Sequence, residues 1–149
     1  MDERGIDVGF LSRYPIVGKP VLHQIQFSKE SVPGGKPPAT RGILEVQVKL
    51  PTGEVMTVFG VHFPSQSHPH SWREDAVATI NNLLAQKNPT DMVLVGGDFN
   101  ITKEEESSSG LFHNVLSKNW SVSHIVGCKD CKGTEVYHNI WSFLDVHLY

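Results

Sequence analysis

The sequence predicts an α+β domain with a mainly antiparallel sheet. Residues 41–50 and 55–62 have the apolar patterns of two strands, and the turn residues Pro51-Thr52-Gly53 separate them, which is typical of an antiparallel pair. An amphipathic helical segment follows, and residues 92–95 then form a short apolar segment with the composition of a buried strand. Strands of this kind around one long helix indicate the α+β class.

The composition fits one domain. With 149 residues, 39% of them hydrophobic, the chain can form a core, and a charged fraction of 19% is too low for a disordered tail. A net charge of −3 argues against a broad basic surface that wraps nucleic acid, because phosphate neutralisation needs clustered Lys and Arg. No apolar run is long enough to span a membrane, and residues 1–5 lack the pattern of a signal peptide. We therefore expect one soluble globular unit.

Two strands and a loop are predicted before the antiparallel pair. Residues 6–11 are mostly apolar and Pro15 follows them, so we expect a short strand that ends before the proline. Residues 21–27 alternate apolar and polar side chains, which is the period of a half-exposed strand. Residues 31–40 contain three prolines and two glycines, which favour a surface loop.

The strand at 55–62 is predicted to be central. Phe59 and Val61 lie on one of its faces and Met56 and Val58 on the other. A strand that is apolar on both faces is covered on both sides.

The helix is predicted to begin at a capping box of Ser71 and Glu74 and to end before Asn88-Pro89. The apolar residues between these points recur at helical spacing and comprise Ala76, Ile80, Leu83 and Leu84. This pattern corresponds to a helix of about four turns.

The strand at 92–95 leads into Gly96-Gly97-Asp98-Phe99-Asn100, and residues 103–110 are predicted to form a charged, Ser-rich loop. The elements expected after this loop are a helical turn at 111–116, short strands at 122–126 and 135–137, and a final buried strand at 141–148. No repeat or linker divides the chain, so we expect a single domain.

Asp98 and Asn100 are the first candidates for chemistry. In an extended backbone, residues two apart point the same way, so a carboxylate and an amide would lie side by side. Gly96 and Gly97 would let a ligand or metal approach the main chain. The alternative is a Gly-Asp turn in which Asn100 is only a turn former.

His62 ends the neighbouring central strand and is followed by a polar turn. It is expected at the same rim of the sheet as Asp98 and Asn100, where it would act as a general acid or phosphate donor. The alternative is an ordinary solvated histidine at a strand end.

Taken together, these motifs resemble the endonuclease/exonuclease/phosphatase family, whose members resemble deoxyribonuclease I and exonuclease III. The segments that carry the resemblance are 6–13, 40–46, 58–65, Arg73 with Ala76, 93–100 and 141–146, in that order. The resemblance covers nearly the whole chain. It implies that the fold is part of a four-layer α/β/β/α sandwich.

The resemblance also implies roles for individual residues. His62 would donate to the phosphate or its leaving oxygen, Asp98 would orient or deprotonate the attacking water, and Asn100 would hold that water or a phosphate oxygen. Asp145 would match the acid that fixes a second histidine, and Arg41 would contact the phosphate unless it is simply exposed. Asp98 and Asn100 would share a metal, and oxygen ligands imply Mg²⁺ or Mn²⁺.

The same resemblance implies that residues 1–149 are a partial domain. The family's first-strand Asn and metal-binding Glu lie upstream of a segment like 6–13, and its Ser-Asp-His lies beyond a strand like 141–148. Glu3 has no support as the missing ligand. We therefore expect this chain alone to be inactive or nearly so.

The expected activity is hydrolysis of phosphodiester bonds, with nucleic acid among the candidate substrates. Alternatives are a phosphomonoesterase or lipid phosphodiesterase on the same scaffold, or an inactive relic that only binds. Residues 31–40 and 66–70, with Trp72, are candidates to line a substrate groove. No protein partner is inferred.

Cys128 and Cys131 leave a further alternative open. Together with His124 or His138 they would form a small zinc module, but the histidines flank them irregularly. A loop disulfide or two free thiols is the favoured interpretation.

Overall fold

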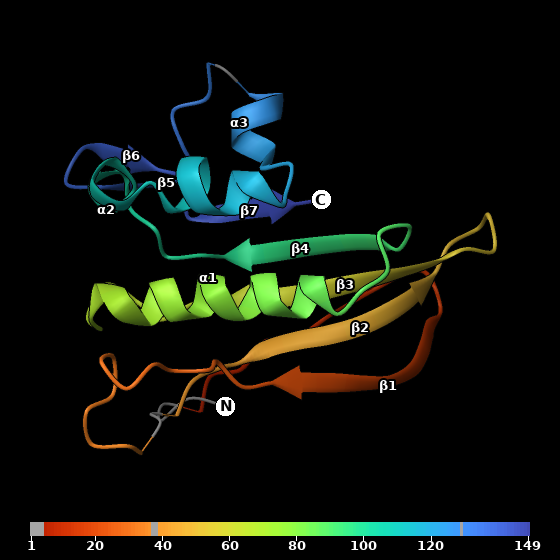
Figure 1. Ribbon diagram of the computed structural model, residues 1–149. Helices are drawn as coiled ribbons and strands as arrows, with labels where there is room; N and C mark the ends of the chain where they lie inside the picture. The colour runs from red at the N-terminus through yellow and green to blue at the C-terminus, as the bar shows by residue number, and fades with distance from the viewer. Residues whose placement is uncertain (1–4, 37–38, 129) are drawn as a thin grey trace.

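The computed structural model describes residues 5–36, 39–128 and 130–149. In this part of the chain, five strands form a sheet in the order β1-β2-β3-β4-β7, and helix α1 covers one face of it (Figure 1). Their bounds are β1 Ile16–His23, β2 Ile43–Lys49, β3 Val55–His62, β4 Met92–Asp98 and β7 Asp145–Leu148. Among the described strands only β3 and β4 pair in parallel, so the predicted α+β class with a mainly antiparallel sheet is confirmed.

Helix α1, His70–Ala85, is the crossover that makes β3 and β4 parallel. Its 16 residues match the predicted four turns, but the predicted capping box is wrong. Pro69, with φ −54°, precedes the first helical residue, and no side chain caps the helix. Glu74 instead pairs with His70 one turn earlier, at 3.3 Å. The sheet and α1 are two of the layers expected of a four-layer sandwich.

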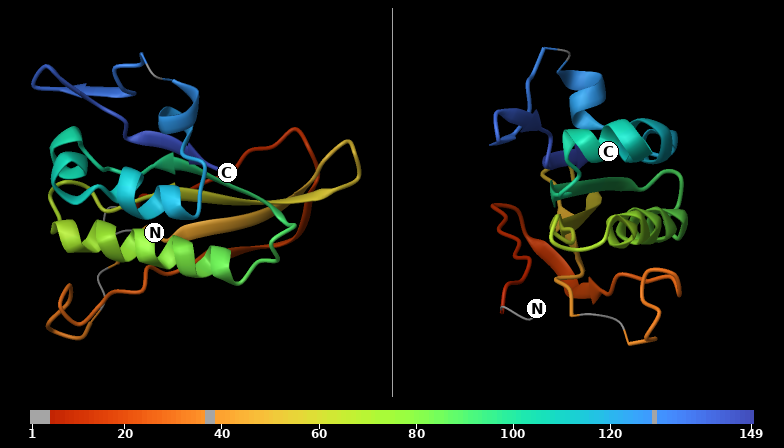
Figure 2. Two further views of the ribbon diagram at one scale, coloured as in Figure 1. Left: turned by 45° about the horizontal axis from the view of Figure 1, so that its top comes forward. Right: turned by 90° about the vertical axis from the view of Figure 1, so that its left-hand side faces the viewer.

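The main core lies between α1 and the sheet, and a smaller cluster lies on the opposite face. Phe59 and Val61 of β3 belong to the main core, whereas Val58 belongs to the smaller cluster together with Val46 and Val48. Strand β3 is therefore central and covered on both faces, as predicted. The right-hand view of Figure 2 shows the N-terminal segment passing over the face opposite α1.

The first two predicted strands need correction. Residues 6–11 join no ladder among the described residues, and Leu11 is 97% exposed, although Phe10 packs against the smaller cluster. Strand β1 covers 16–23 instead of 21–27, because its partner β2 begins at Ile43, opposite His23. Beyond that point the N–H of Gln26 donates to the side chain of Thr79.

The loop predicted at 31–40 contains no helix or strand among its described residues; residues 37 and 38 lie outside them. The described residues also contain no helix long and apolar enough to cross a membrane.

The segment predicted as a charged loop at 103–110 is helix α2, Lys103–Ser109. Thr102 accepts the N–H of Glu105 as the N-cap, and the glutamates of the first turn favour the positive end of the helix dipole. Gly110, at φ 64°, ends the helix in the left-handed conformation. These local signals outweighed the Ser-rich composition.

The helical turn predicted at 111–116 is confirmed by the π-helix η1, Leu111–Val115, and the 3-10 helix η2, Leu116–Lys118. The strand predicted at 122–126 is wrong, since only Val122 bridges to Leu148 before helix α3, Ser123–Gly127. The predicted strand at 135–137 is β5, Glu135–Tyr137.

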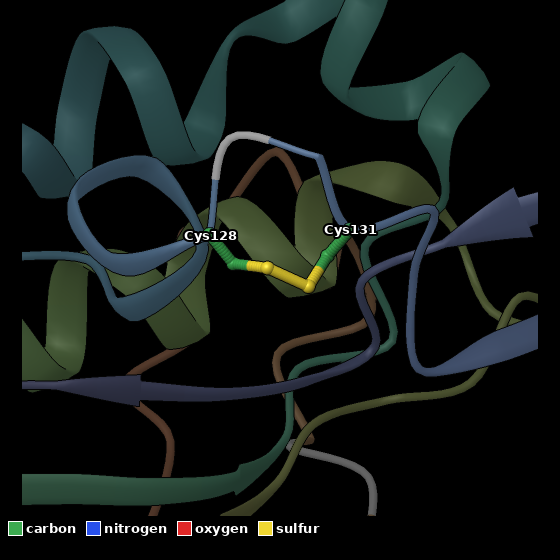
Figure 3. Close-up of a disulfide and its surroundings, with 2 residues drawn as sticks. All are labelled: Cys128 and Cys131. Carbon is green, nitrogen blue, oxygen red and sulfur yellow. A yellow bond between two sulfur atoms is a disulfide. The ribbon is translucent and has the colours of Figure 1, made fainter.

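The final strand predicted at 141–148 is two strands. Strand β6, Ile140–Ser142, pairs with β5, whereas β7 pairs with β4. Between them, the Leu144 carbonyl accepts the N–H of Phe99. Cys128 and Cys131, between α3 and β5, form a disulfide with Cα atoms 5.5 Å apart (Figure 3). Of the alternatives for these cysteines, the structure contains the disulfide.

Candidate active site at the ends of β3, β4 and β7

Three of the predicted residues lie in one row across the ends of neighbouring strands. His62 of β3 pairs in register with Asp98 of β4, and Asp98 pairs with Asp145 of β7. Val146, between Asp145 and His147, is buried in the main core, so the row lies on the face opposite α1. His62 Nε2 and Asp98 Oδ2 are 3.3 Å apart, and both side chains are about one-third exposed, at 35% and 28%. The row is therefore accessible to solvent.

The two glycines before Asp98 lie in close contact with the neighbouring strands. Gly97 has φ 141°, and a Cβ there would lie 2.0 Å from the carbonyl oxygen of Val61. A Cβ at Gly96 would lie 2.9 Å from the His147 ring. At both positions the missing side chain lets the neighbouring strand approach closely. These contacts account for both glycines, and the approach of a ligand or metal to the main chain stays a prediction.

Asn100 does not lie beside the Asp98 carboxylate with its amide exposed. Its φ is 53°, so the extended backbone assumed in the prediction ends at Asp98. The Asn100 N–H donates to Asp98 Oδ1 at 2.8 Å, and its Nδ2 donates to the Phe63 carbonyl at 3.0 Å. Asn is one of the few residues that tolerates this conformation. The turn-former alternative describes its backbone, and its amide links the ends of β3 and β4.

Arg41 is neither exposed nor part of the row. Its side chain is buried, and Nη1 lies 3.5 Å from the Phe63 carbonyl oxygen, the same acceptor that Asn100 uses. Arg41 and Asn100 therefore converge on the main chain directly after His62.

A buried ion pair behind the row was not predicted. Arg73 of α1, 2% exposed, donates from Nε and Nη2 to the carboxylate of Glu105 in α2, with distances of 2.6 to 2.9 Å. Its Nη1 donates to the carbonyls of Pro64 and Ser65 at 3.1 and 2.9 Å. The pair thus fixes the turn that follows His62. Arg73 was part of the family resemblance, and its position four residues before Val77 on the apolar face of the helix was the signal for its burial.

Gln66 joins this ion pair to the strand ends. Its Nε2 donates to the carbonyl of Asn100 at 2.5 Å and to Glu105 at 3.0 Å. Burial alone would raise the pKa of Glu105, but hydrogen bonds from Arg73, His70 and Gln66 outweigh it and hold the pKa below its usual value. Glu105 is therefore ionised at neutral pH.

His147 was also missed. It pairs with Gly96, one step along β7 from Asp145, and its exposed side chain projects from the same face as the row. The spacing of Asp145 and His147, two residues apart in a predicted strand, was the available signal.

The loops expected to line a substrate groove are held together on the α1 side of the sheet. Trp72 Nε1 donates to the Ser31 carbonyl at 3.0 Å, and its ring stacks on His68. A cavity of about 490 Å³ lies elsewhere, beyond the ends of β4 and β7, with walls that include Ile101, Ser142 and Phe143.

His124 lines this cavity and stacks on Phe143 at 4.4 Å between ring centroids. Burial there is the main cause that lowers the pKa of its imidazole, and the nearby His113 lowers it further. Glu106 acts in the opposite direction. His124 thus packs as a neutral aromatic side chain rather than in a cysteine–histidine metal site.

Comparison with known proteins identifies the family to which the chain is similar. The model of the endonuclease/exonuclease/phosphatase family matches residues 1–144. The human Nocturnin catalytic domain with bound sulfate anion has a TM-score of 0.55 at 15% identity, over 92% of this chain and 48% of its own. An endonuclease/exonuclease/phosphatase from Beutenbergia cavernae DSM 12333 has a TM-score of 0.46 at 25% identity, over 61% of this chain and 22% of its own. The chain thus spans half or less of these structures, and no curated protein matches it.

Proposed function

The chain belongs to the endonuclease/exonuclease/phosphatase family, and from that premise we propose that the row of His62, Asp98 and Asp145 hydrolyses phosphodiester bonds by attack of water at phosphorus. The observation that carries the proposal is the register of the three strand ends, which brings an imidazole and two carboxylates together on one accessible face. Family membership gives the chain a phosphoesterase scaffold, and the Nocturnin likeness gives the fold.

The residues of the row have complementary roles. The Asp98 carboxylate accepts a proton from water as the water oxygen bonds to phosphorus. His62 gives a proton to the oxygen that leaves as its bond to phosphorus breaks. Acid–base help of this kind contributes about 10²–10⁴ in rate. The distance of 3.3 Å between His62 Nε2 and Asp98 Oδ2 supports this division, because it holds acid and base side by side.

The other predicted residues take positioning roles in this proposal. Arg41 and Asn100 both donate to the Phe63 carbonyl, so they hold His62 in place from behind. Asp145 extends the row on β7 and would orient an imidazole beside it. We assign no direct phosphate contact to Arg41, because its side chain is buried.

Members of the family generally use a divalent cation, which neutralises phosphate oxygens and activates water when bound. The described residues do not fit a complete metal site, because they contain no group of three or more His, Cys, Asp or Glu side chains placed to hold an ion. Asn100, expected as a shared ligand, uses its Nδ2 for the Phe63 carbonyl, so its Oδ1 would be the ligand atom. We propose Mg²⁺ or Mn²⁺ as the ion on ligand chemistry, with Asp98 as a ligand.

We further propose that these 149 residues alone turn over slowly, since the row supplies acid and base without a complete set of metal ligands. The test is hydrolysis of bis(p-nitrophenyl) phosphate and of single-stranded DNA with Mg²⁺ or Mn²⁺ present. We expect weak turnover that Asp98→Asn removes and that Asp91→Asn, an exposed change at the other end of β4, leaves unchanged.

The outcomes separate the alternatives. Turnover of a phosphomonoester or phospholipid, but not of the diesters, would replace the substrate class and keep the site. Turnover that survives Asp98→Asn would contradict the proposed base. No hydrolysis together with no phosphate binding would leave a relic on the same fold.

A further inference from the structure

We infer that His147 is a second phosphate-binding residue of this site, an assignment that rests on the proposed function. Val146 and Leu148 are buried in the main core at 1% and 0% exposure. The alternation of a strand therefore directs Asp145 and His147 to the opposite face. His147 pairs with Gly96 and Asp145 with Asp98, so the imidazole belongs to the rung next to the row.

The imidazole leans over β4 rather than away from the sheet. The position where a Cβ would stand on Gly96 is 2.9 Å from His147 Cδ2 and 3.4 Å from its Nε2. Only the absence of a side chain at Gly96 leaves this space for the ring. The ring therefore lies beside Asp98, on the side of the row nearest the centre of the sheet.

The ring nitrogens of His147 are available to a ligand. Its backbone N–H donates to Ser123 Oγ at 3.1 Å, which fixes β7. Within the part of the chain that the structure describes, the ring itself takes part in no hydrogen bond or ion pair, and the side chain is exposed. An imidazole has an N–H donor in either tautomer.

A phosphate ester fits between the two histidines. Both rings lean toward β4: His62 Nε2 lies 3.3 Å from Asp98 Oδ2, and His147 Nε2 lies 3.4 Å from the Cβ position of Gly96. Positions 96 and 98 on one face of β4 are about 7 Å apart, a gap that one phosphate with a hydrogen bond on each side can span. His62 on β3 and His147 on β7 flank Asp98 on β4 from opposite sides. His62 would donate to the leaving oxygen, and His147 would bind a non-bridging oxygen of the group whose phosphorus the water attacks.

The competing explanation is that the ring only fills the space over Gly96. Two substitutions separate these roles. His147→Leu fills the space without a donor, whereas His147→Gln keeps an N–H donor on a flexible side chain. His113→Gln is the matched control, because His113 is exposed on η1 and pairs with Glu106.

The experiment is a titration of the chain with inorganic phosphate, followed by the NMR signals of the histidine rings. We expect the signals of His62 and His147 to move together with one apparent Kd. His147→Leu should weaken that Kd roughly 5-fold, the usual effect of one lost hydrogen bond, while His147→Gln and His113→Gln stay within about 2-fold of the parent.

A His147 signal that stays still while His62 responds, or an unchanged Kd in His147→Leu, would overturn the inference and leave the proposed function standing. If neither histidine responds, the proposed site itself fails. The parent chain alone distinguishes these two results, so the answer does not depend on the folding of any variant.

Discussion

At the scale of single residues, the site is determined by backbone conformations that few side chains tolerate. Gly97, at φ 141°, brings β4 against the Val61 carbonyl, and Asn100, at φ 53°, turns the chain so that its N–H reaches the Asp98 carboxylate. Both conformations lie in the region that L side chains rarely adopt. The orientation of Asp98 therefore depends on its two neighbours as much as on its own side chain.

Replacing Gly97 by Ala should destabilise the protein by more than about 3 kcal/mol, because the new methyl group would lie on the Val61 carbonyl oxygen as well as at a positive φ. Gly53→Ala is the control, since Gly53 also has a positive φ but has no atom within 4 Å of the added Cβ. It should cost about 1 kcal/mol. Urea unfolding of both variants measures the difference, and equal losses would show that the close approach of β4 to β3 is not what Gly97 provides.

At the scale of elements, the sequence predicted the helices and strands whose apolar periodicity is visible in consecutive residues. The alternation in β2, the apolar faces of β3 and the helical period of α1 each appear in consecutive residues, and all three elements formed. Residues 6–11 have the composition of a strand but no partner edge among the described residues, and composition cannot reveal that. In α2 the cap and the glutamates decided the structure, although its serines suggested a loop.

The site residues divide in the same way into those that local sequence indicates and those that depend on tertiary contacts. His62 and Asp98 were predictable because each ends an apolar strand, whereas Asp145 was predicted from the family resemblance and proved to be the first residue of β7. Arg73 and Glu105 were not, because they are 32 residues apart and meet only when α2 packs beside α1. The side-chain direction of Asn100 depends on one positive φ that no periodicity encodes.

Glu105→Gln should be strongly destabilising, by about 3–5 kcal/mol, because it leaves the buried guanidinium of Arg73 without its charge partner. Glu104→Gln, on the exposed side of the same turn, should stay within about 0.5 kcal/mol of the parent. Thermal and urea unfolding measure both. A Glu105→Gln variant as stable as Glu104→Gln would contradict the role of this pair as the link between α1, α2 and the turn after His62.

The same substitution has a pH signature. The folded-state pKa of Glu105 is below the ordinary value of 4.5, so its contribution to stability is fully present above that pH and is lost as the pH falls through the lower folded value. The parent should therefore lose more stability than Glu105→Gln on acidification below pH 4.5. Parallel loss in the two proteins would show that other carboxylates, such as Glu45, dominate there.

At the scale of the whole molecule, the two faces of the sheet are unequally covered. The main core joins α1 to the sheet, whereas the opposite face has a smaller cluster with Phe10 across it. Strand β1 forms one edge of the sheet, and its Val21 and Leu22 are 47% and 40% exposed. An edge strand with exposed apolar side chains favours association with other chains.

Val21→Lys should slow aggregation several-fold without loss of stability. The new ammonium group lies on an edge strand opposite Glu45 in the β1–β2 register, where opposite charges are favourable. Light scattering on heating measures the rate, and Val21→Thr separates the loss of apolar surface from the gain of charge. Aggregation of Val21→Lys at the parent's rate would show that β1 is not the associating edge.

The order of the strands along the chain has a consequence for the way the protein matures. The hairpin of β2 and β3 needs only contacts close in sequence, and α1 then brings β4 alongside, so the core and the pair of His62 and Asp98 can assemble before β7 is made. Asp145 and His147 arrive only with β7, which docks on a sheet that is already formed. During synthesis at the ribosome, the protein would thus become compact first, and Asp145 and His147 would join His62 and Asp98 afterwards.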